Sequence, residues 1–472
     1  MRVKKIEIKN IYRVFSGIYF WIAFFFILRL IGISNPPLES GHNWRQITGL
    51  MVARNFLETN NSIIYPRIDL ISANSNTGII GMEFPILNYL HYLISLVFGY
   101  SHWYGRLINL IVSTLGIVSF YKVLKIVFDE KLAFFSTFFL ITSIWFAYSR
   151  KIMPDTFSIS LMFIGIFFCS KYITSNNYKY LFYFILFSSI GILSKIPAGI
   201  YFVLILPLAV YSRDLANKTK IIVSLIIPIS LCFIWYFKWN FHLELEYGNW
   251  YNSGKSISEG TIDIINNLGL TFQKFYFSSF NSYILFVVFF TGIISMVSSG
   301  IKYLNAIFFS MLFIFIIYIL KSGRFFYHHS YYIIPFVPIM ALICGFVVSK
   351  IENKKFVFLI LFSSSIECIA NQYNDFFIKD SEKYKIKLEN ISNKVCDKND
   401  LIVINGGESP QDIYFSNRKG WSVDGQMFAN QKFIDELITK GCKFVFVNKH
   451  NYYVALNKKI LFSDEDYIVY EL

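Results

Sequence analysis

Polar residues that could bind anions or exchange protons form five clusters, each near the end of an apolar run. The first cluster, PPLESGHNWRQITGLMVARNF, contains Glu39, His42, Arg45, Gln46 and Arg54. A carboxylate here can orient or deprotonate a hydroxyl group, and the guanidinium groups can neutralise a phosphate. A solvated loop that leads into an amphipathic helix would explain the same residues, so both interpretations stay open.

Two further carboxylates define the second and third clusters. Glu83 occurs in GMEFP, and Asp155 occurs in YSRKIMPDTF. Charged groups at a membrane boundary are costly unless they are solvated or paired. One interpretation makes Asp155 a helix cap directly after Pro154, and the other places it in an anion site with Arg150 and Lys151.

The last two clusters are LSKIPAG and KSGRFFYHHSYYIIPFVP. In the first, Lys195 either extends to the lipid surface or contacts a phosphate. The second brings Arg324, His328 and Tyr331 close together in the sequence. Its two adjacent histidines point in different directions on a helix, so we do not expect them to bind one metal jointly. A single histidine, His328, could join Glu83 at a divalent metal ion.

The composition places these clusters in a membrane protein. Of the 472 residues, 55% are hydrophobic and only 16% are charged, whereas soluble domains carry about 25% charged residues. The formal charge of +14 is spread over many short breaks between apolar runs. A nucleic-acid-binding face would cluster its basic residues, so this distribution argues against a nucleic-acid partner and fits an excess of Lys and Arg on the cytoplasmic side.

Apolar runs long enough to cross a bilayer occur throughout the first 370 residues. The first run follows a basic N-terminal segment, 1–13, and no cleavage pattern follows it, so we read it as an uncleaved helix with a cytoplasmic N-terminus. We predict about eleven crossings, which lie near 14–28, 105–127, 131–148, 155–172, 180–195, 197–212, 219–238, 282–299, 304–321, 331–349 and 355–370.

The run FPILNYLHYLISLVF at 84–98 is interrupted by Asn88 and His91, and we predict that it lies along the membrane interface. This choice puts two long loops, at about 34–104 and 239–281, outside the cytoplasm together with all five clusters. Most of the inner breaks then contain lysine, as the positive-inside rule expects. The loop at 239–281 is either a lid or a solvated connection.

From residue 371 onward the composition is that of a soluble domain. LIVIN at 401–405 and KFVFVN at 443–448 are typical of strands, and FIDELITKG between them is typical of a helix closed by glycine. This order indicates a small α/β domain over 371–472, outside the membrane if eleven crossings are right. Cys396 and Cys442 could form a disulfide there. The six cysteines show no zinc-binding spacing.

Together and in this order, the clusters resemble the GT-C superfamily of polyprenyl-phosphate-dependent glycosyltransferases, especially the bacterial branch with aminoarabinose transferase and relatives of protein O-mannosyltransferases. The resemblance covers about residues 14–350. It lies in the acidic first outer loop, EFPILNYLHYLISLVFGYSHWYGRLINLIVSTLG, SRKIMPD, LSKIPAG and GRFFYHHSYYIIPFVPIMAL. It implies a membrane helix bundle beneath two partly helical outer loops. With the crossings counted above, we expect a polytopic α-helical membrane domain, 1–370, of about eleven transmembrane helices, followed by the small C-terminal α/β domain.

The resemblance also implies an activity: inverting transfer of a sugar from a polyprenyl-phosphate donor to a glycan, lipid or protein acceptor outside a bacterial-type plasma membrane. It makes Glu39 the expected base and gives Asp155 the role of acceptor positioning or of a second acid. Lys195 and Arg324 are expected at the donor phosphate. No cofactor is required with certainty, and a divalent metal stays open. The alternatives are a transporter or flippase of lipid-linked saccharides, against which the lack of a visible internal repeat argues, and an inactive scaffold of the same fold.

Overall fold

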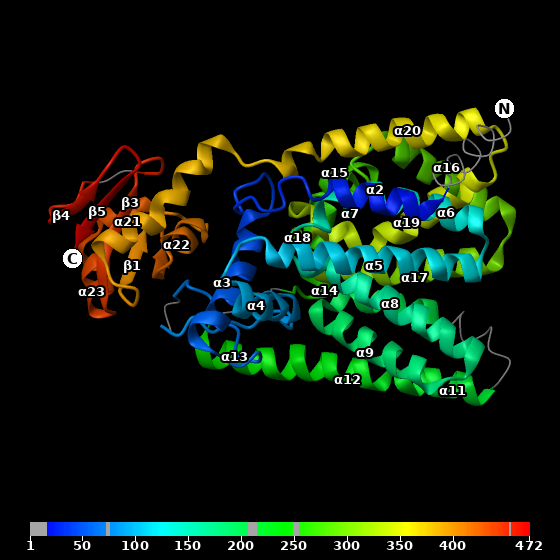
Figure 1. Ribbon diagram of the computed structural model, residues 1–472, viewed down its shortest axis with the longest axis horizontal. Coiled ribbons are helices and arrows are strands. Elements are labelled where there is room, and N and C mark those ends of the chain that lie inside the picture. Colours follow the sequence, from blue (N-terminus) through cyan, green and yellow to red (C-terminus); the bar gives the residue numbers. More distant parts are fainter. Residues whose placement is uncertain (1–16, 72–75, 206–214, 249–253, 453–454) are drawn as a thin grey trace, which may run out of the picture. The chain divides into compact units, whose positions relative to one another are not determined.

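The computed structural model describes residues 17–71, 76–205, 215–248, 254–452 and 455–472 (Figure 1). The basic segment 1–13, the start of the first predicted crossing and the last part of the one at 197–212 lie outside the described residues. The chain divides into two compact units. Unit 1 comprises Met1–Ile33, Arg106–Lys238 and Asn252–Phe376, and unit 2 comprises Ser34–Gly105, Trp239–Tyr251 and Phe377–Leu472.

Unit 1 is built from helices. They are α2 (Ile18–Leu28), α5 (Tyr104–Val127), α6 (Glu130–Thr142), α7 (Trp145–Tyr148), α8 (Pro154–Ser175), α9 (Tyr178–Ser194), η1 (Ile196–Leu204), α11 (Leu215–Ser224), α12 (Ile226–Phe233), η2 (Ile234–Trp239), α14 (Ile257–Asn266), α15 (Leu268–Gln273), η3 (Lys274–Ser278), α16 (Tyr283–Ser299), α17 (Lys302–Ser322), α18 (Arg324–His328), η4 (Ser330–Phe336), α19 (Val337–Ser349), α20 (Lys354–Asn371) and η5 (Tyr373–Phe376). Two of the points where the chain passes from one unit to the other lie in helices, within the first turn of α5 and at the end of η2.

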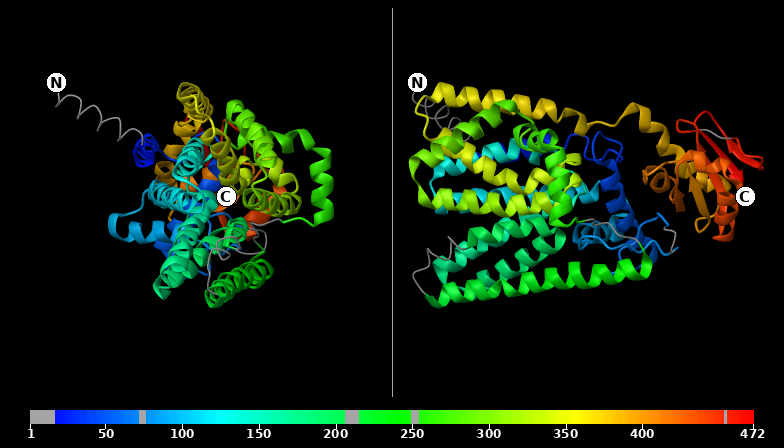
Figure 2. Two further views of the ribbon diagram at one scale, coloured as in Figure 1. Left: turned by 90° about the vertical axis from the view of Figure 1, so that its right-hand side faces the viewer. Right: turned by 180° about the vertical axis from the view of Figure 1, so that it is seen from behind.

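Small residues allow these helices to pack closely. Helix α8 packs along α9, and α19 packs against α6 and α16 (Figures 1 and 2). Gly165 of α8 faces Ser188 of α9, and Gly345 of α19 faces Ser136 of α6, so that a Cβ atom at either glycine would overlap its neighbour. Such close approach is how helices associate in lipid, where burial of apolar surface gives little gain.

Among the residues that the structure describes, five helical segments are long and apolar enough to cross a membrane. They are Tyr104–Val127, Pro154–Ser175, Ala216–Tyr247, Lys302–Ser322 and Ser330–Ser349. A sixth is formed if Leu268–Ser278 and Tyr283–Ser299, which are bent by 96°, make one span. We predicted about eleven crossings, and the described part of each contains helix. Several of those helices are shorter than the roughly 20 residues that a span needs. The segment 131–148, which we predicted as one crossing, forms two helices, α6 and α7.

The predicted loop at 239–281 is mostly helical. The helix that begins at Ala216 continues without a break to Tyr247, beyond the end that its apolar run suggested. After it, α14, α15 and η3 fill most of the remaining segment. These helices could not be located from the residue pattern, because α14 is short and its apolar residues alternate with polar ones.

Unit 2 combines helices with the sheet. Its elements are α3 (Asn43–Thr59), α4 (Ile86–Phe98), α13 (Asn240–Tyr247), η6 (Asp380–Lys387), α21 (Leu388–Val395), β1 (Leu401–Ile404), α22 (Gln411–Ser416), β2 (Lys419–Ser422), η7 (Gly425–Ala429), α23 (Gln431–Thr439), β3 (Cys442–Asn448), β4 (Ile460–Ser463) and β5 (Tyr467–Glu471). Helix α4 has 13 residues, too few to cross a bilayer. It buries Asn88 and His91 and exposes Leu96, Val97 and Phe98. Its location at the membrane interface stays a prediction.

The C-terminal residues form a five-stranded sheet in the order β2-β1-β3-β5-β4. Strand β1 pairs in parallel with β2 and β3, and β5 pairs antiparallel with β3 and β4. The predicted strands at 401–405 and 443–448 and the helix between them are confirmed as β1, β3 and α23, and Gly441 follows the helix with a φ of 89°. Sequence analysis missed β2, β4 and β5, which are short.

The first long segment extends this sheet. Backbone hydrogen bonds join Ile71 N to Gly420 O and Gly420 N to Asp69 O, at 2.9 and 3.0 Å, so that residues 69–71 pair with β2. Glu39 likewise bridges to Ile378 in an antiparallel pair. The C-terminal domain is therefore joined to the segment that follows the first predicted crossing.

All six cysteines lie in the described part of the chain and are free thiols. Cys442 is buried at the start of β3, and Cys396 is half-buried after α21. The disulfide that their positions in the sequence allowed is therefore not formed.

Candidate active site

A rigid turn precedes α8 and fixes the position of Asp155. The side-chain amide of Asn109, on α5, donates hydrogen bonds to the carbonyl groups of Tyr148, Lys151 and Met153, at 3.2, 2.7 and 3.3 Å. Its oxygen accepts a hydrogen bond from Thr156 Oγ1 at 3.2 Å. One buried amide thus satisfies several backbone carbonyl groups that the turn would otherwise leave without partners. Sequence analysis missed Asn109 because it lies within an apolar run.

Asp155 forms an ion pair with Lys195 through Oδ1. The side chain of Asp155 is 3% exposed and that of Lys195 is 13% exposed. Asp155 lies in the first turn of α8, where the helix dipole stabilises a negative charge, but the N-cap itself is Met153. Its second oxygen, Oδ2, is buried and has no hydrogen-bond partner among the residues that the structure describes. One acceptor site of the carboxylate is thus left for a ligand.

Aromatic rings surround the ammonium group of Lys195. Its Nζ lies 4.8 Å from the ring centroid of Tyr331 and 5.8 Å from that of Tyr332. Tyr148 Oη is hydrogen-bonded to Ser330 Oγ at 2.6 Å, which joins the turn before α8 to η4. The structure therefore brings together three of the predicted residues, Asp155, Lys195 and Tyr331. Lys195 points into this cluster and not toward the lipid surface.

Arg150 and Lys151 also stabilise the turn that precedes α8. Arg150 is 2% exposed and donates hydrogen bonds to the carbonyl groups of Arg29, Ile31 and Asp375, at 3.0, 2.6 and 3.1 Å. Lys151 Nζ pairs with Asp375 Oδ1 at 2.6 Å. Because the guanidinium group of Arg150 is occupied by backbone carbonyls, the geometry favours a structural role over the predicted anion binding.

Arg324 and His328 lie on the short helix α18, and both are exposed. The neighbouring His329, for which the sequence gives no specific role, stacks on the ring of Tyr331 with centroids 5.2 Å apart. The helix is held by Asp263 of α14, whose Oδ2 accepts hydrogen bonds from the backbone N–H of Arg324, at 2.9 Å, and from Lys255 Nζ, at 2.8 Å. The bond from Lys255 and then the bond from Arg324 lower the pKa of Asp263.

We expect Asp263→Ala to loosen α18. The Arg324 N–H loses its acceptor and Lys255 loses its partner, so amide hydrogen exchange over 323–328 should become roughly fivefold faster, the effect of a lost helix cap. Thr261→Ala is the matched control, since the Thr261 hydroxyl bonds only to Ile257 O of its own helix. Mass spectrometry of peptides from both variants measures the difference. Equal exchange in the two variants would show that Asp263 does not hold this helix.

The predicted residues of the first outer segment lie in unit 2. Glu39 is 2% exposed, and its carbonyl oxygen accepts a hydrogen bond from Asn43 Nδ2. His42 precedes α3 with a φ of 57°, and Gln46 is buried in the first turns of that helix. Arg45 forms an ion pair with Glu83. The structure thus joins two of the predicted residues, Arg45 and Glu83, directly.

Arg54 is buried on α3 and interacts with three groups. Its Nη2 pairs with Asp69 Oδ2 at 2.6 Å, its Nη1 donates to Tyr414 O at 3.1 Å, and the guanidinium carbon lies 4.5 Å from the Tyr414 ring centroid. Burial lowers the pKa of Arg54, but the Asp69 carboxylate outweighs it, and the net shift is upward. These contacts support a structural role in place of the predicted phosphate contact.

No metal site is evident in the described ranges, where no three His, Cys, Asp or Glu side chains are placed to share an ion. Glu83 lies in unit 2, paired with Arg45, whereas His328 lies in unit 1. The proposed pair of metal ligands therefore stays a prediction.

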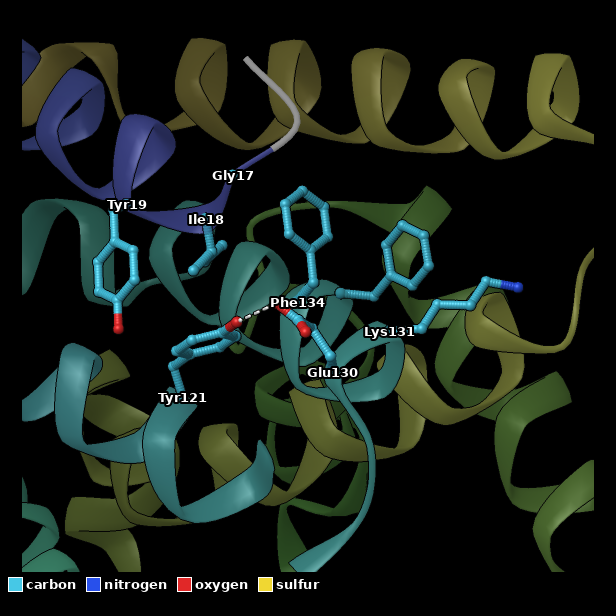
Figure 3. A pocket seen from close by; sticks show the side chains of 8 residues that line it. Gly17, Ile18, Tyr19, Tyr121, Glu130, Lys131 and Phe134 are labelled. Atoms are coloured by element: carbon cyan, nitrogen blue, oxygen red, sulfur yellow. Dashed lines mark hydrogen bonds between the residues drawn. The ribbon is translucent and has the colours of Figure 1, made fainter. Parts of the chain in front are cut away.

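One cavity of about 420 Å³ lies where α2 begins, α5 ends and α6 begins (Figure 3). Tyr19, Tyr121 and Phe134 line it, and Tyr121 Oη donates a hydrogen bond to Glu130 Oε1 at 3.2 Å. Tyr121 is twelve residues beyond Asn109 on α5, which is about 18 Å along the helix axis. The cavity is therefore separate from the Asp155 cluster, and none of the predicted site residues lines it.

The fold and these clusters define a multi-pass helical membrane protein with a polar site at the ends of its helices. Residues 83–237, about a third of the chain, match the family model of dolichyl-phosphate-mannose-protein mannosyltransferase. This matched range contains Glu83, Asp155 and Lys195. No curated protein sequence matches the chain significantly.

Two solved structures are similar over nearly the whole chain. ArnT from Cupriavidus metallidurans bound to undecaprenyl phosphate has a TM-score of 0.61 and 10% identity, covering 96% of this chain and 98% of that one. The oligosaccharyltransferase of Archaeoglobus fulgidus, in complex with zinc and sulfate, has a TM-score of 0.59 and 12% identity, covering 92% and 68%. The resemblance to the GT-C superfamily is therefore confirmed, and the chain has the GT-C fold.

Proposed function

We propose that this protein is a membrane glycosyltransferase that transfers a sugar from a polyprenyl-phosphate donor to an acceptor outside the cytoplasm. The single observation that carries the proposal is the buried Asp155–Lys195 pair, which lies beside Tyr331 and leaves one carboxylate oxygen without a partner in the described part of the chain. The family model and the two GT-C structures support glycosyl transfer in general. The structure of ArnT with undecaprenyl phosphate supports a lipid-phosphate donor.

In the proposed reaction, the acceptor hydroxyl attacks the anomeric carbon with inversion. The bond between that carbon and the phosphate oxygen breaks, and polyprenyl phosphate leaves with the electron pair. A carboxylate takes the proton of the hydroxyl, and we assign this role to Glu39. Asp155 orients the acceptor or acts as a second acid. Lys195 and Arg324 stabilise the negative charge on the departing phosphate, which is where a cation contributes most.

Release of polyprenyl phosphate tests this proposal. Protein purified in detergent is incubated with a polyprenyl-phosphate sugar and an extract of envelope lipids and glycans as acceptor. We expect wild-type protein to release polyprenyl phosphate, and Glu39→Gln and Asp155→Asn to lower the rate at least about a hundredfold. Glu130→Gln is the matched control, because Glu130 also pairs with a lysine, Lys125 at 2.9 Å, but beside the separate cavity.

The other outcomes identify the alternatives. Movement of the donor across a vesicle membrane without bond cleavage would indicate a transporter or flippase. Binding of the donor with neither cleavage nor movement would indicate an inactive scaffold. Normal turnover in both carboxylate variants would remove the site assignment and leave the activity in place.

The proposed reaction also requires a particular orientation of the protein in the membrane. The proposed transfer takes place outside the cytoplasm, so we place the protein in a bacterial-type plasma membrane with its N-terminus inside and residues 371–472 outside. Protease added to intact spheroplasts should then cleave the C-terminal domain, and full protection of that domain would contradict the orientation.

A further inference from the structure

Lys274 is a buried cation that the proposed mechanism does not yet use. It is 7% exposed and begins η3, a π-helical turn within unit 1. In the part of the chain that the structure describes, its ammonium group forms no ion pair and no hydrogen bond with a side chain, and its carbonyl oxygen accepts a bond from Ser279 N at 2.9 Å. A lysine side chain that is largely buried and has no ion-pair partner is costly, so a protein keeps one where it serves a purpose.

Two contacts connect the turn that carries Lys274 to segments next to the Asp155 cluster. The Phe275 ring packs on Phe336 of η4, with centroids 6.2 Å apart, and η4 is the segment that carries Tyr331. On the other side, Ser279 O accepts a hydrogen bond from Ile144 N at 3.1 Å. Ile144 lies at the break between α6 and α7, four residues before Tyr148.

The backbone at this point is also unusual. The helix through η3 and the helix α16 meet at 96° after a break of four residues, which makes them either a broken span or a re-entrant segment. At membrane depth such irregular backbone is tolerated only where it is buried in protein or lines a cavity that water can enter. Both π-helical turns and broken membrane helices occur frequently at binding sites.

We propose that Lys274 binds the phosphate group of the polyprenyl lipid, as a second cation in addition to Lys195. The inference rests on the proposed function and adds a residue to its donor site. A phosphate is the ligand that fits, because it supplies the negative charge and the acceptor oxygens that Lys274 lacks. The aromatic surroundings, with Phe275, Phe315 and Phe336 in mutual contact, suit an apolar carrier next to that phosphate.

Binding of three probes to Lys274→Met tests this proposal. Methionine keeps an apolar side chain of similar length without the charge. We expect the affinity for polyprenyl phosphate to fall about tenfold to a hundredfold, the usual effect of losing a hydrogen bond to a charged group. The affinity for uncharged polyprenol should not change. Inorganic phosphate should bind wild-type protein far more weakly, and equal affinity would overturn the lipid assignment in favour of a free anion.

Thermal stability separates binding from a structural role. Removal of a buried charge without a partner should leave the Tm of the ligand-free protein unchanged or raise it, whereas a lysine that the fold needs would lower it. Lys274→Arg should recover part of the affinity, and Lys302→Met, an exposed position at the start of α17, is the matched control. A lower Tm for Lys274→Met, or unchanged affinity for polyprenyl phosphate, would overturn the inference.

Release of polyprenyl phosphate from the donor distinguishes failure of the proposed function from failure of the role of Lys274. If wild-type protein releases no polyprenyl phosphate from the donor, the proposed function fails. If wild-type protein does so and Lys274→Met has an unchanged KM for the donor, only the role of Lys274 fails. We expect kcat/KM for the donor to fall in Lys274→Met. Most of this fall should come from a raised KM for the donor and a smaller part from a lower kcat.

Discussion

Lys195→Met is expected to lower kcat/KM for the sugar donor at least about a hundredfold. The same variant should lower the free energy of unfolding of unit 1 by about 3 to 5 kcal/mol. The loss of rate follows because a cation at the departing phosphate would be missing. The loss of stability follows because Asp155, 3% exposed, would remain as a buried carboxylate without its partner. Donor turnover and thermal unfolding in detergent measure the two effects separately.

The double variant Asp155→Asn, Lys195→Met separates the two causes. It removes both charges, so most of the lost stability should return, since the cost of breaking a buried pair comes mainly from the charge left behind. Transfer should not return, because the double variant has neither the carboxylate nor the ammonium group that the proposed reaction uses. Recovery of transfer together with stability would show that the pair only supports the fold and that the reaction takes place elsewhere.

The Asp155–Lys195–Tyr331 cluster was predictable because of how membrane helices constrain a chain. Each residue lies at the end of an apolar run that crosses or nearly crosses the bilayer. When such runs alternate in direction, the ends on one side meet at the same level even if they are far apart in sequence. Residues 40 and 136 positions apart were assigned to one face for this reason, and the structure brings their side chains together.

The direction in which a side chain points could not be predicted in the same way. Arg150 and Arg54 occur in polar motifs that suggested anion binding, but both are buried and bonded to the protein. Their partners are backbone carbonyls and one aspartate that local sequence does not place beside them. Of two adjacent histidines, His329 and not the predicted His328 stacks on Tyr331, which depends on the break between α18 and η4.

Lys274 and Asp263 were missed for a different reason. Both lie in the segment 239–281, which reads as a polar connection because its helices are short and their apolar residues do not form a run of membrane length. Positive-inside counting also gives no weight to an isolated lysine within such a segment. Only the packing of η3 and α14 against the segment 320–336 brings these residues near the candidate site.

Arg54→Met should have the largest effect on unit 2. It removes the ion pair with Asp69, the hydrogen bond to Tyr414 O and the contact with the Tyr414 ring, so that Asp69, 5% exposed, is left charged and buried. Breaking a buried pair by removing one partner costs about 3 to 5 kcal/mol. Because Tyr414 is on α22, we expect the C-terminal domain to become sensitive to protease at a lower temperature.

The exposed pair Lys398–Glu58 gives the matched control. It also joins α3 to the C-terminal domain, at 2.9 Å, but its side chains are 47% and 33% exposed. An exposed ion pair contributes at most about 1 kcal/mol, so Lys398→Gln should change protease sensitivity little. The two variants each remove one cation from the same connection, and they compare a buried ion pair with an exposed one. Equal sensitivity in both would mean that burial of Arg54 is not what joins the first outer segment to the C-terminal sheet.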